Sequence, residues 1–228
     1  MKAEKRLTGR VSLLASFVWS KSIDDADTVI PAMYQSVGAE DENNLRLERA
    51  RSSFNVGRRI SAGYVINLPA VSALGPALRN WQLSGTVLLQ DGVPLDIFYY
   101  GFDPDNTGLP NRPNIVPGVS LTLPRSQRNT MTFFNTAAFT APAPYTFGDA
   151  GRNIVTGPGN VESDFALHRR FPIPDHGAVE LRVEAFNLFN HPNWGVPGSY
   201  ADFSPPLFGG ILASGDPRRF QFAARYGF

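Results

Sequence analysis

Asp103, Asp105 and Thr107 stand at alternate positions ahead of Gly108 and could supply oxygen ligands to a calcium ion. Oxygen donors at this spacing, followed by a glycine turn, are how calcium loops begin. The twelfth position, which supplies a bidentate carboxylate in such loops, is Asn114. We therefore expect a surface turn built from Asp, Asn and Gly here, with calcium binding as the alternative.

The three histidines, His168, His176 and His191, are not two or four positions from one another, so their spacing does not predict zinc. Without cysteine there is no thiolate ligand or cysteine nucleophile. The sequence has no P-loop, Rossmann glycine pattern or nucleophile elbow, and the glycines at 148–151 and 157–159 are typical of turns. We expect no catalytic residue, no cofactor and no metal, and hence no enzyme.

Ionisable side chains recur on alternate positions in two neighbouring segments near the carboxyl end. They are Asp164, His168, Arg170, Glu180, Arg182 and Glu184. Because a tight turn at 172–177 joins the segments, these side chains should face one another across an antiparallel pair. The pattern predicts a structural ion-pair ladder, and contact with a plug or a passing solute is the alternative.

Composition excludes some classes of protein. Lys and Arg number 21 against 20 Asp and Glu, so no basic field favours nucleic acid. No run of about 18 apolar residues is present, which excludes a membrane-spanning helix. The first twenty residues imitate a secretory signal, with basic residues ahead of residues 11–19. However, Ser12 and Ser16 interrupt that stretch at even spacing, which favours a strand.

Alternating apolar and polar residues predict six strands, all antiparallel. They cover residues 5–21, 54–68, 81–90, 161–171, 179–189 and 218–228, and the third could continue through residues 95–100. The connections alternate between long and short, as in outer-membrane barrels. With the long loops outside, Phe17, Trp19, Phe54 and Phe189 form an upper aromatic girdle and Trp81, Phe171, Tyr226 and Phe228 a lower one. The charges on the apolar face, Arg58, Arg169 and Arg218, lie near strand ends, where the membrane tolerates them best.

Several stretches resemble the carboxyl-terminal barrel of TonB-dependent receptors, especially the Oar-like group. They are SFVWSKSIDD at 16–25, NWQLSG at 80–85, FGDAGRN at 147–153, AFNLFNHPN at 185–193 and the terminal strand. The resemblance implies an outer-membrane receptor for nutrient uptake, with about 22 strands around a plug. Residues 1–228 would then be a carboxyl-terminal barrel segment without the plug and amino-terminal domains, and Met1 the start of a truncated frame.

The resemblance also assigns sites and partners. Phe220, Phe222 and Tyr226 would face lipid, Phe228 would also be an insertion signal, and the ladder charges would line the lumen. The expected partners are outer-membrane lipid, the rest of the barrel and its plug, the barrel-assembly machinery and, indirectly, the TonB system. The substrate stays open among siderophores, peptides and oligosaccharides.

Two other interpretations remain open on the sequence. One is a secreted β-sandwich that binds carbohydrate, with Trp19, Trp81 or Trp194 as a stacking platform. The other is an autotransporter-like or porin-like barrel, which would share the terminal strand but not the ordered receptor motifs. The sandwich predicts a soluble protein whose tryptophan fluorescence is quenched by sugar.

Overall fold

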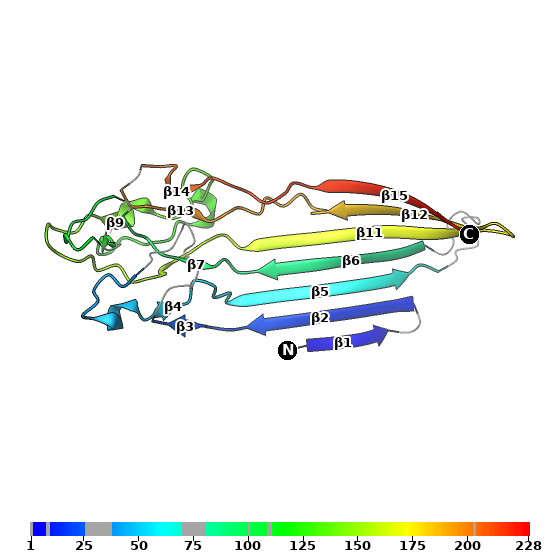
Figure 1. Cartoon of the computed structure of the whole chain (residues 1–228), viewed down its shortest axis with the longest axis horizontal. Helices are drawn as coiled ribbons and strands as arrows, with labels where there is room; N and C mark the ends of the chain where they lie inside the picture. The colour runs from blue at the N-terminus through cyan, green and yellow to red at the C-terminus, as the bar shows by residue number, and fades with distance from the viewer. Residues whose placement is uncertain are drawn as a thin grey trace.

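The computed structural model describes residues 2–7, 10–25, 38–69, 81–99, 101–108, 111–202 and 204–228. A sheet of seven antiparallel strands dominates it, in the order of the sequence. The strands are β1 (Lys2–Leu7), β2 (Val11–Trp19), β5 (Arg58–Asn67), β6 (Trp81–Gln90), β11 (Asn160–Ile173), β12 (Gly177–Phe186) and β15 (Arg219–Gly227). They lie side by side in one layer (Figure 1). The predicted all-β antiparallel class is confirmed, and the two-layered sandwich is wrong.

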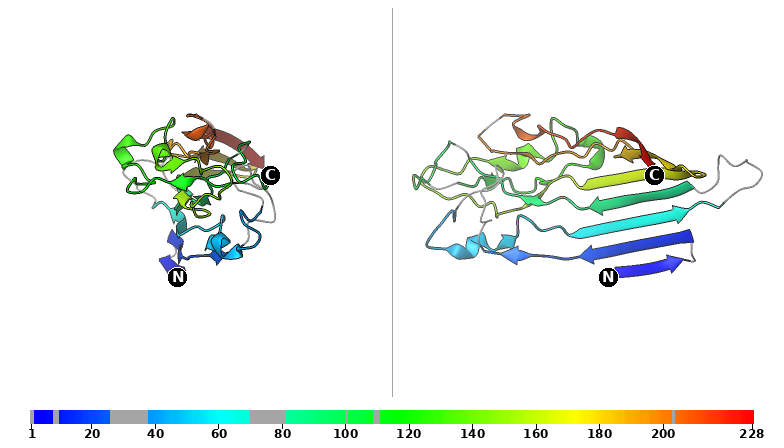
Figure 2. Two further views of the ribbon diagram at one scale, coloured as in Figure 1. Left: turned by 90° about the vertical axis from the view of Figure 1, so that its left-hand side faces the viewer. Right: turned by 45° about the vertical axis from the view of Figure 1, so that its right-hand side comes forward.

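The remaining elements are short and belong to the long connections at one end of the sheet (Figure 2). They are β3 (Ile23–Asp24), η2 (Leu45–Glu48), β4 (Ala50–Arg51), β7 (Pro94–Leu95), β8 (Asn114–Ile115), η5 (Arg125–Gln127), η6 (Thr136–Ala138), β9 (Phe139–Thr140), β10 (Val155–Thr156), β13 (Pro197–Ser199) and β14 (Phe208–Ile211). We call the described parts of 20–57, 91–159 and 187–218 the cap. No helix among the described residues is long and apolar enough to cross a membrane.

The register brings the apolar positions of successive strands onto one face. One row crosses six strands through Val11, Ile66, Leu83, Leu167, Val183 and Phe222, each the partner of the next. Since a slip of one residue would move a strand's whole apolar set to the other face, this agreement fixes the register. Phe222 is 76% exposed, so the apolar face is not the surface of a closed protein core.

The single strand predicted over residues 5–21 is wrong, because β1 and β2 are two paired strands with Leu7 opposite Val11. An odd number of residues, 8–10, separates these partners. The alternation therefore continues in phase from one strand to the next, and periodicity alone shows no break. This division raises the number of strands in the sheet from the predicted six to seven.

Two other predicted strands end earlier than expected. The run 95–100 does not extend β6; its described part enters the cap, where Leu95 and Ile97 are almost completely buried. The strand predicted to reach residue 189 ends at Phe186, because Asn187 has a left-handed φ of 49° that turns the chain away. Both errors arise where an apolar sequence serves the cap instead of the sheet.

The cap has a hydrophobic core of its own. Its buried members are Leu95, Ile97, Phe133, Phe134, Val155 and Phe208, with Trp194 and five other partly buried residues packed around them. Phe134 meets the rings of Phe139 and Phe208 edge to face. These residues come from two connections that are distant in the sequence, 91–159 and 187–218, which therefore pack together as one folded unit.

Candidate functional site

Buried ion pairs fasten the connections of the cap to one another. Arg112, with its side chain 2% exposed, donates from Nε to Glu40 Oε2 at 2.8 Å and from a terminal nitrogen to Glu48 Oε1 at 2.7 Å. Arg152 donates to the Glu48 carbonyl at 2.9 Å and pairs with Asp24. Since each buried charge has an opposite partner, the arrangement fastens the connection 20–57 to the connection 91–159.

The pKa directions follow from this burial. Burial raises the pKa of Glu40 despite the opposing charge of Arg112. For Asp24, burial acts against ionisation, but hydrogen bonds from Ser52 and Arg152 and the charge of Arg152 lower its pKa below the ordinary value. Asp24 is therefore ionised at neutral pH and contributes its charge to the pair with Arg152.

The contacts within the cap explain several residues of two sequence motifs, FGDAGRN at 147–153 and AFNLFNHPN at 185–193. In FGDAGRN, Arg152 joins the ion pairs, and a Cβ at Gly148 would collide with the Arg112 carbonyl. In AFNLFNHPN, the Asn187 side chain binds both backbone groups of His191, at 2.9 and 3.0 Å. The Asn193 side chain binds both backbone groups of Val161 at 2.9 Å, which ties the cap to the start of β11.

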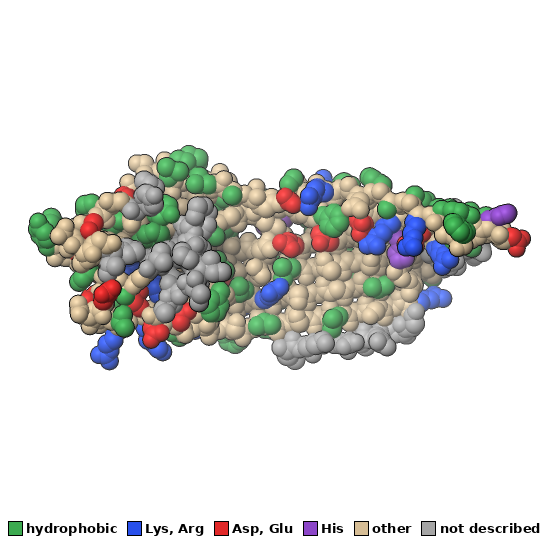
Figure 3. All heavy atoms as spheres, viewed as in Figure 1, with side chains coloured by type: hydrophobic (Ala, Val, Ile, Leu, Met, Phe, Trp, Pro, Cys, Tyr) green, Lys and Arg blue, Asp and Glu red, His purple; other side chains and the backbone are tan. Residues whose placement is uncertain are grey.

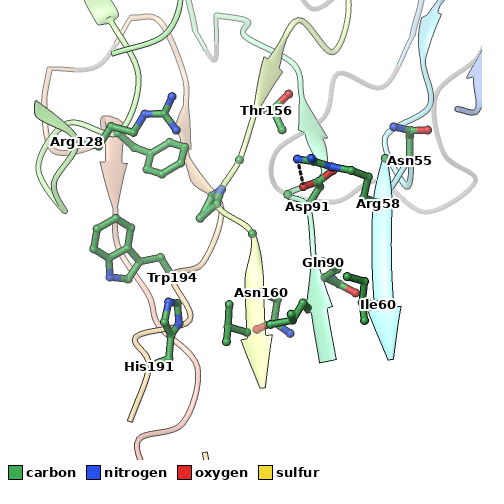
Figure 4. A pocket seen from close by; sticks show the side chains of 18 of the residues that line it. Asn55, Arg58, Ile60, Gln90, Asp91, Arg128, Thr156, Asn160, His191 and Trp194 are labelled. Carbon is green, nitrogen blue, oxygen red and sulfur yellow. Dashed lines mark hydrogen bonds and ion pairs between the residues drawn. The ribbon is translucent and has the colours of Figure 1, made fainter. Parts of the chain in front are cut away.

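A groove of about 1080 Å³ lies where the cap meets the apolar face (Figure 4). Its floor is a row of partners on four strands, Phe17, Ile60, Leu89 and Val161. The cap contributes Arg125, Arg128, Phe133, His191 and Trp194 to its lining. Arg58 and Asp91 lie at one side and form a double hydrogen bond of 2.8 and 3.0 Å. The sequence reasoning missed this groove, since no local pattern links these segments.

The three charges predicted on the apolar face all have partners. Arg58 is held by Asp91, whose pKa these hydrogen bonds lower. The Arg169 guanidinium lies 4.2 Å from the centre of the Phe171 ring and 5.8 Å from that of Trp81. Arg218 donates to the Leu188 carbonyl, and its guanidinium lies 5.6 Å from the centre of the Phe220 ring. These partners reduce the cost of placing the charges on an apolar surface.

The ladder residues lie on the opposite, polar face. Arg170 is the register partner of Glu180, and His168 is the partner of Arg182. Arg182 and Glu184 form an ion pair at 2.6 Å along β12, whereas the Asp164 carboxylate accepts the Asn187 backbone N–H. Figure 3 shows acidic and basic side chains gathered over β11, β12 and β15. The structure brings the predicted residues together on one wall; their role toward a lumen stays a prediction.

Asp164, Arg182 and Glu184 also border a shallow groove of about 460 Å³ on this face. Small residues of the neighbouring strands, Ser12, Gly63, Ser84 and Thr86, line it together with larger apolar ones such as Leu14, Val65 and Phe186. The lining therefore mixes charged and apolar side chains and offers no evident nucleophile with a neighbouring base.

The terminal aromatics are exposed on the apolar face and at its end. Phe220, Phe222 and Tyr226 are 54 to 76% exposed, and Phe228 is fully exposed. Phe17, Trp19, Phe54 and Phe189 are exposed at the cap end of the strands. Trp81 and Phe171 pack against each other at the opposite end. Both groups therefore lie where the girdles were predicted, while the insertion signal at Phe228 stays a prediction.

Three of the four carboxylate oxygens in the candidate calcium loop accept hydrogen bonds from neighbouring groups. Asp103 accepts hydrogen bonds from the Gly108 N–H at 2.9 Å and from the Asn111 side chain at 3.0 Å. Asp105 accepts from the backbone and the hydroxyl of Thr107. This is the surface-turn geometry that the sequence predicted.

The three tryptophans do not form a stacking platform. Trp19 lies at the cap end of β2, Trp81 at the opposite end of the sheet on β6, and Trp194 packs edge to face on Phe133 inside the cap. The carbohydrate-binding interpretation therefore loses both its fold and its site.

Comparison with known proteins identifies the family. The model of the outer membrane beta barrel domain matches residues 1–221, nearly the whole chain. No curated protein and no solved structure gives a significant match. The family agrees with the single-layered sheet, the segregated connections and the exposed apolar face. The chain belongs to the outer membrane beta barrel domain family and is located in the outer membrane.

Proposed function

We propose that this chain forms part of the wall and outer loops of a TonB-dependent receptor of the Oar-like group, which takes up nutrients. The open sheet is the observation that supports this most. Among the described residues, β1 and β15 each have a partner on one side only. Unpaired strand edges are not stable against lipid, so further strands must complete the barrel. A receptor barrel of about 22 strands would supply them.

The cap supports a receptor more than a simple pore. Its connections are fastened by buried ion pairs and a hydrophobic core, so they form a fixed surface over one end of the sheet. A fixed outer surface suits selective capture of a scarce solute, because little conformational entropy is lost on binding. Capture, rather than bond-breaking chemistry, is the proposed role, and we infer that the chain is not an enzyme.

The proposed partners follow from this role. The polar face, with Asp164, Arg182 and Glu184 around its groove, would face the lumen and a plug domain. The apolar face would contact outer-membrane lipid, and the aromatic terminal strand would be recognised by the barrel-assembly machinery. The TonB system would act on the plug rather than on this segment, and nucleic acid has no part in the proposal.

Uptake in cells tests the proposal. We compare a strain that produces the full-length gene product with a deletion strain, using labelled ferric siderophore, oligopeptide and oligosaccharide. The proposal predicts that the deletion abolishes accumulation of one probe. It also predicts that a protonophore or deletion of TonB has the same effect on the wild type. Uptake by the wild type that survives both the protonophore and the deletion of TonB would indicate a passive pore. Normal uptake of all three probes in the strain that lacks this gene would exclude them as substrates and overturn the proposal.

A further inference from the structure

The groove between cap and apolar face has an unusual combination of surfaces. Its floor is the apolar row Phe17, Ile60, Leu89 and Val161. The groove is also lined by four arginines, Arg51, Arg58, Arg125 and Arg128, and by a single carboxylate, Asp91. We call these charged residues its rim. An apolar floor below a cationic rim matches a molecule with an anionic head and an apolar tail.

The arginine charges are only partly compensated. Arg51 donates to the Thr156 hydroxyl at 3.0 Å and to the Asn153 carbonyl at 3.1 Å, which are neutral acceptors. Arg128 donates to the Leu123 carbonyl and lies 5.3 Å from the Phe133 ring centre. Of the four, Arg58 is bound to the groove's carboxylate. The rim therefore keeps a positive field that an anion would satisfy.

Arginine is suited to phosphate, because its planar fork donates two parallel hydrogen bonds to two oxygens. Figure 4 shows Arg128 and the Arg58–Asp91 pair on opposite sides of the groove, with Trp194 and His191 beside it. A phosphate on the side of Arg128 would meet arginine donors from the cap that are not engaged with a carboxylate. A free phosphate would leave the apolar floor uncovered, whereas an acyl chain would cover it.

The position of the groove indicates where that amphiphile would come from. The floor is continuous with the apolar face of the sheet, and the chain is an outer-membrane protein. The rim lies at the cap end of the strands, where the exposed Trp19 is the register partner of Arg58. Aromatic side chains of this kind are enriched at the level of lipid headgroups.

We propose that this groove binds a membrane lipid with a phosphate headgroup, its phosphate beside Arg125 and Arg128 and its acyl chain along Ile60 and Leu89. The site would anchor the cap to the membrane surface. It depends on the outer-membrane location and not on nutrient uptake, so the two proposals can fail separately.

Fluorescence quenching tests the site, because Trp194 lines the groove. The full protein, with Trp19→Phe and Trp81→Phe and no other tryptophan near the groove, is titrated in detergent with brominated phosphatidic acid or brominated phosphatidylcholine. The first has an accessible phosphate and the second masks it with choline. We expect phosphatidic acid to quench Trp194 at a roughly tenfold lower mole fraction, as charge-assisted hydrogen bonds of this kind imply.

The variant Arg125→Gln with Arg128→Gln should lose this preference. Arg46→Gln with Arg49→Gln is the matched control, since it removes equal charge from exposed cap residues that do not line the groove. Arg125→Gln alone is a second variant that keeps the bond from Arg128 to Leu123. Thermal unfolding followed by Trp194 checks that each variant is folded.

Three results would overturn the proposal. The first is equal quenching by the two lipids. The second is an equal loss of preference in the control variant, which would indicate a general effect of charge. The third is displacement of phosphatidic acid by inorganic phosphate at equal concentration, which would show that the site binds phosphate without a lipid tail.

Discussion

In the sheet, most side chains of the apolar face stay exposed or half-buried, whereas in the cap Arg112, Leu95 and Phe134 are almost completely buried. The sheet is held by backbone hydrogen bonds and relies on its surroundings to cover its apolar face. The cap buries its own core and its own charges. The difference shows that a β-barrel segment can contain a soluble-type folded unit made from its loops alone.

The largest effect is expected from Arg112→Met, which leaves Glu40 buried without its ion-pair partner and Glu48 with only the 3.8 Å contact to Arg152. An uncompensated buried charge costs about 3–5 kcal/mol. Denaturant unfolding followed by Trp194, with the other tryptophans replaced by phenylalanine, should show this loss in the cap. Hydrogen exchange in β11 and β12 should stay close to wild type. Equal loss of protection in sheet and cap would break the division between the two regions.

A smaller loss is expected from Gly148→Ala. The added Cβ would collide with the Arg112 carbonyl, and such overpacking costs about 1–3 kcal/mol. Gly38→Ala is the matched control in the same unit, because nothing lies within 4 Å of its Cβ position. The control should stay within about 0.5 kcal/mol of wild type in the same measurement. If both variants behave alike, the close approach of Gly148 to the Arg112 carbonyl is not what constrains the cap.

Acid should weaken the cap through Asp24. Its pKa is lowered in the folded protein from the ordinary 3.8, so its ion pair stabilises the cap fully above that pH. This contribution is lost as the pH falls through the lowered pKa. The stability difference between wild type and Asp24→Asn should therefore be constant from neutral pH to about pH 5 and vanish in stronger acid. A difference that disappears already near neutral pH would contradict the lowered pKa.

The smallest effect is expected on the polar face. Arg182→Gln removes the ion pair with Glu184, in which the Arg182 side chain is 48% exposed. Exposed pairs contribute about 0.2–1 kcal/mol, and salt screens them. Thermal unfolding of the sheet at low and high salt would measure this difference. A loss as large as that of Arg112→Met would mean that the ladder is buried in the intact protein, for example against a plug.

Much of the sheet could be predicted, because a strand with one apolar face leaves a period of two in the sequence. The division of the first alternating run into two strands could not be predicted in this way. Leu7 and Val11 keep the same phase on either side of residues 8–10, so the sequence of β1 and β2 has the pattern of one strand. Gly9 was the available signal for a break.

The cap and its groove could not be predicted from periodicity. Arg112 and Glu48 are 64 residues apart in the sequence, and Arg152 and Asp24 are 128 apart. Such pairs leave no local pattern. The motifs around Gly148 and Asn187 could be recognised by resemblance, but their roles as close-packing and side-chain fastening residues became visible only in three dimensions.

The central claim is that the apolar face of the sheet meets lipid and the polar face does not. Neighbouring positions on β15 test it, since Phe222 and Gln221 point to opposite faces. We introduce Phe222→Cys or Gln221→Cys into the full protein, label each with a bimane fluorophore in outer-membrane fragments, and compare a lipid-attached nitroxide quencher with aqueous iodide. We predict that the label at 222 is quenched by the lipid nitroxide and the label at 221 by iodide. Quenching of both labels by iodide alone would contradict the account.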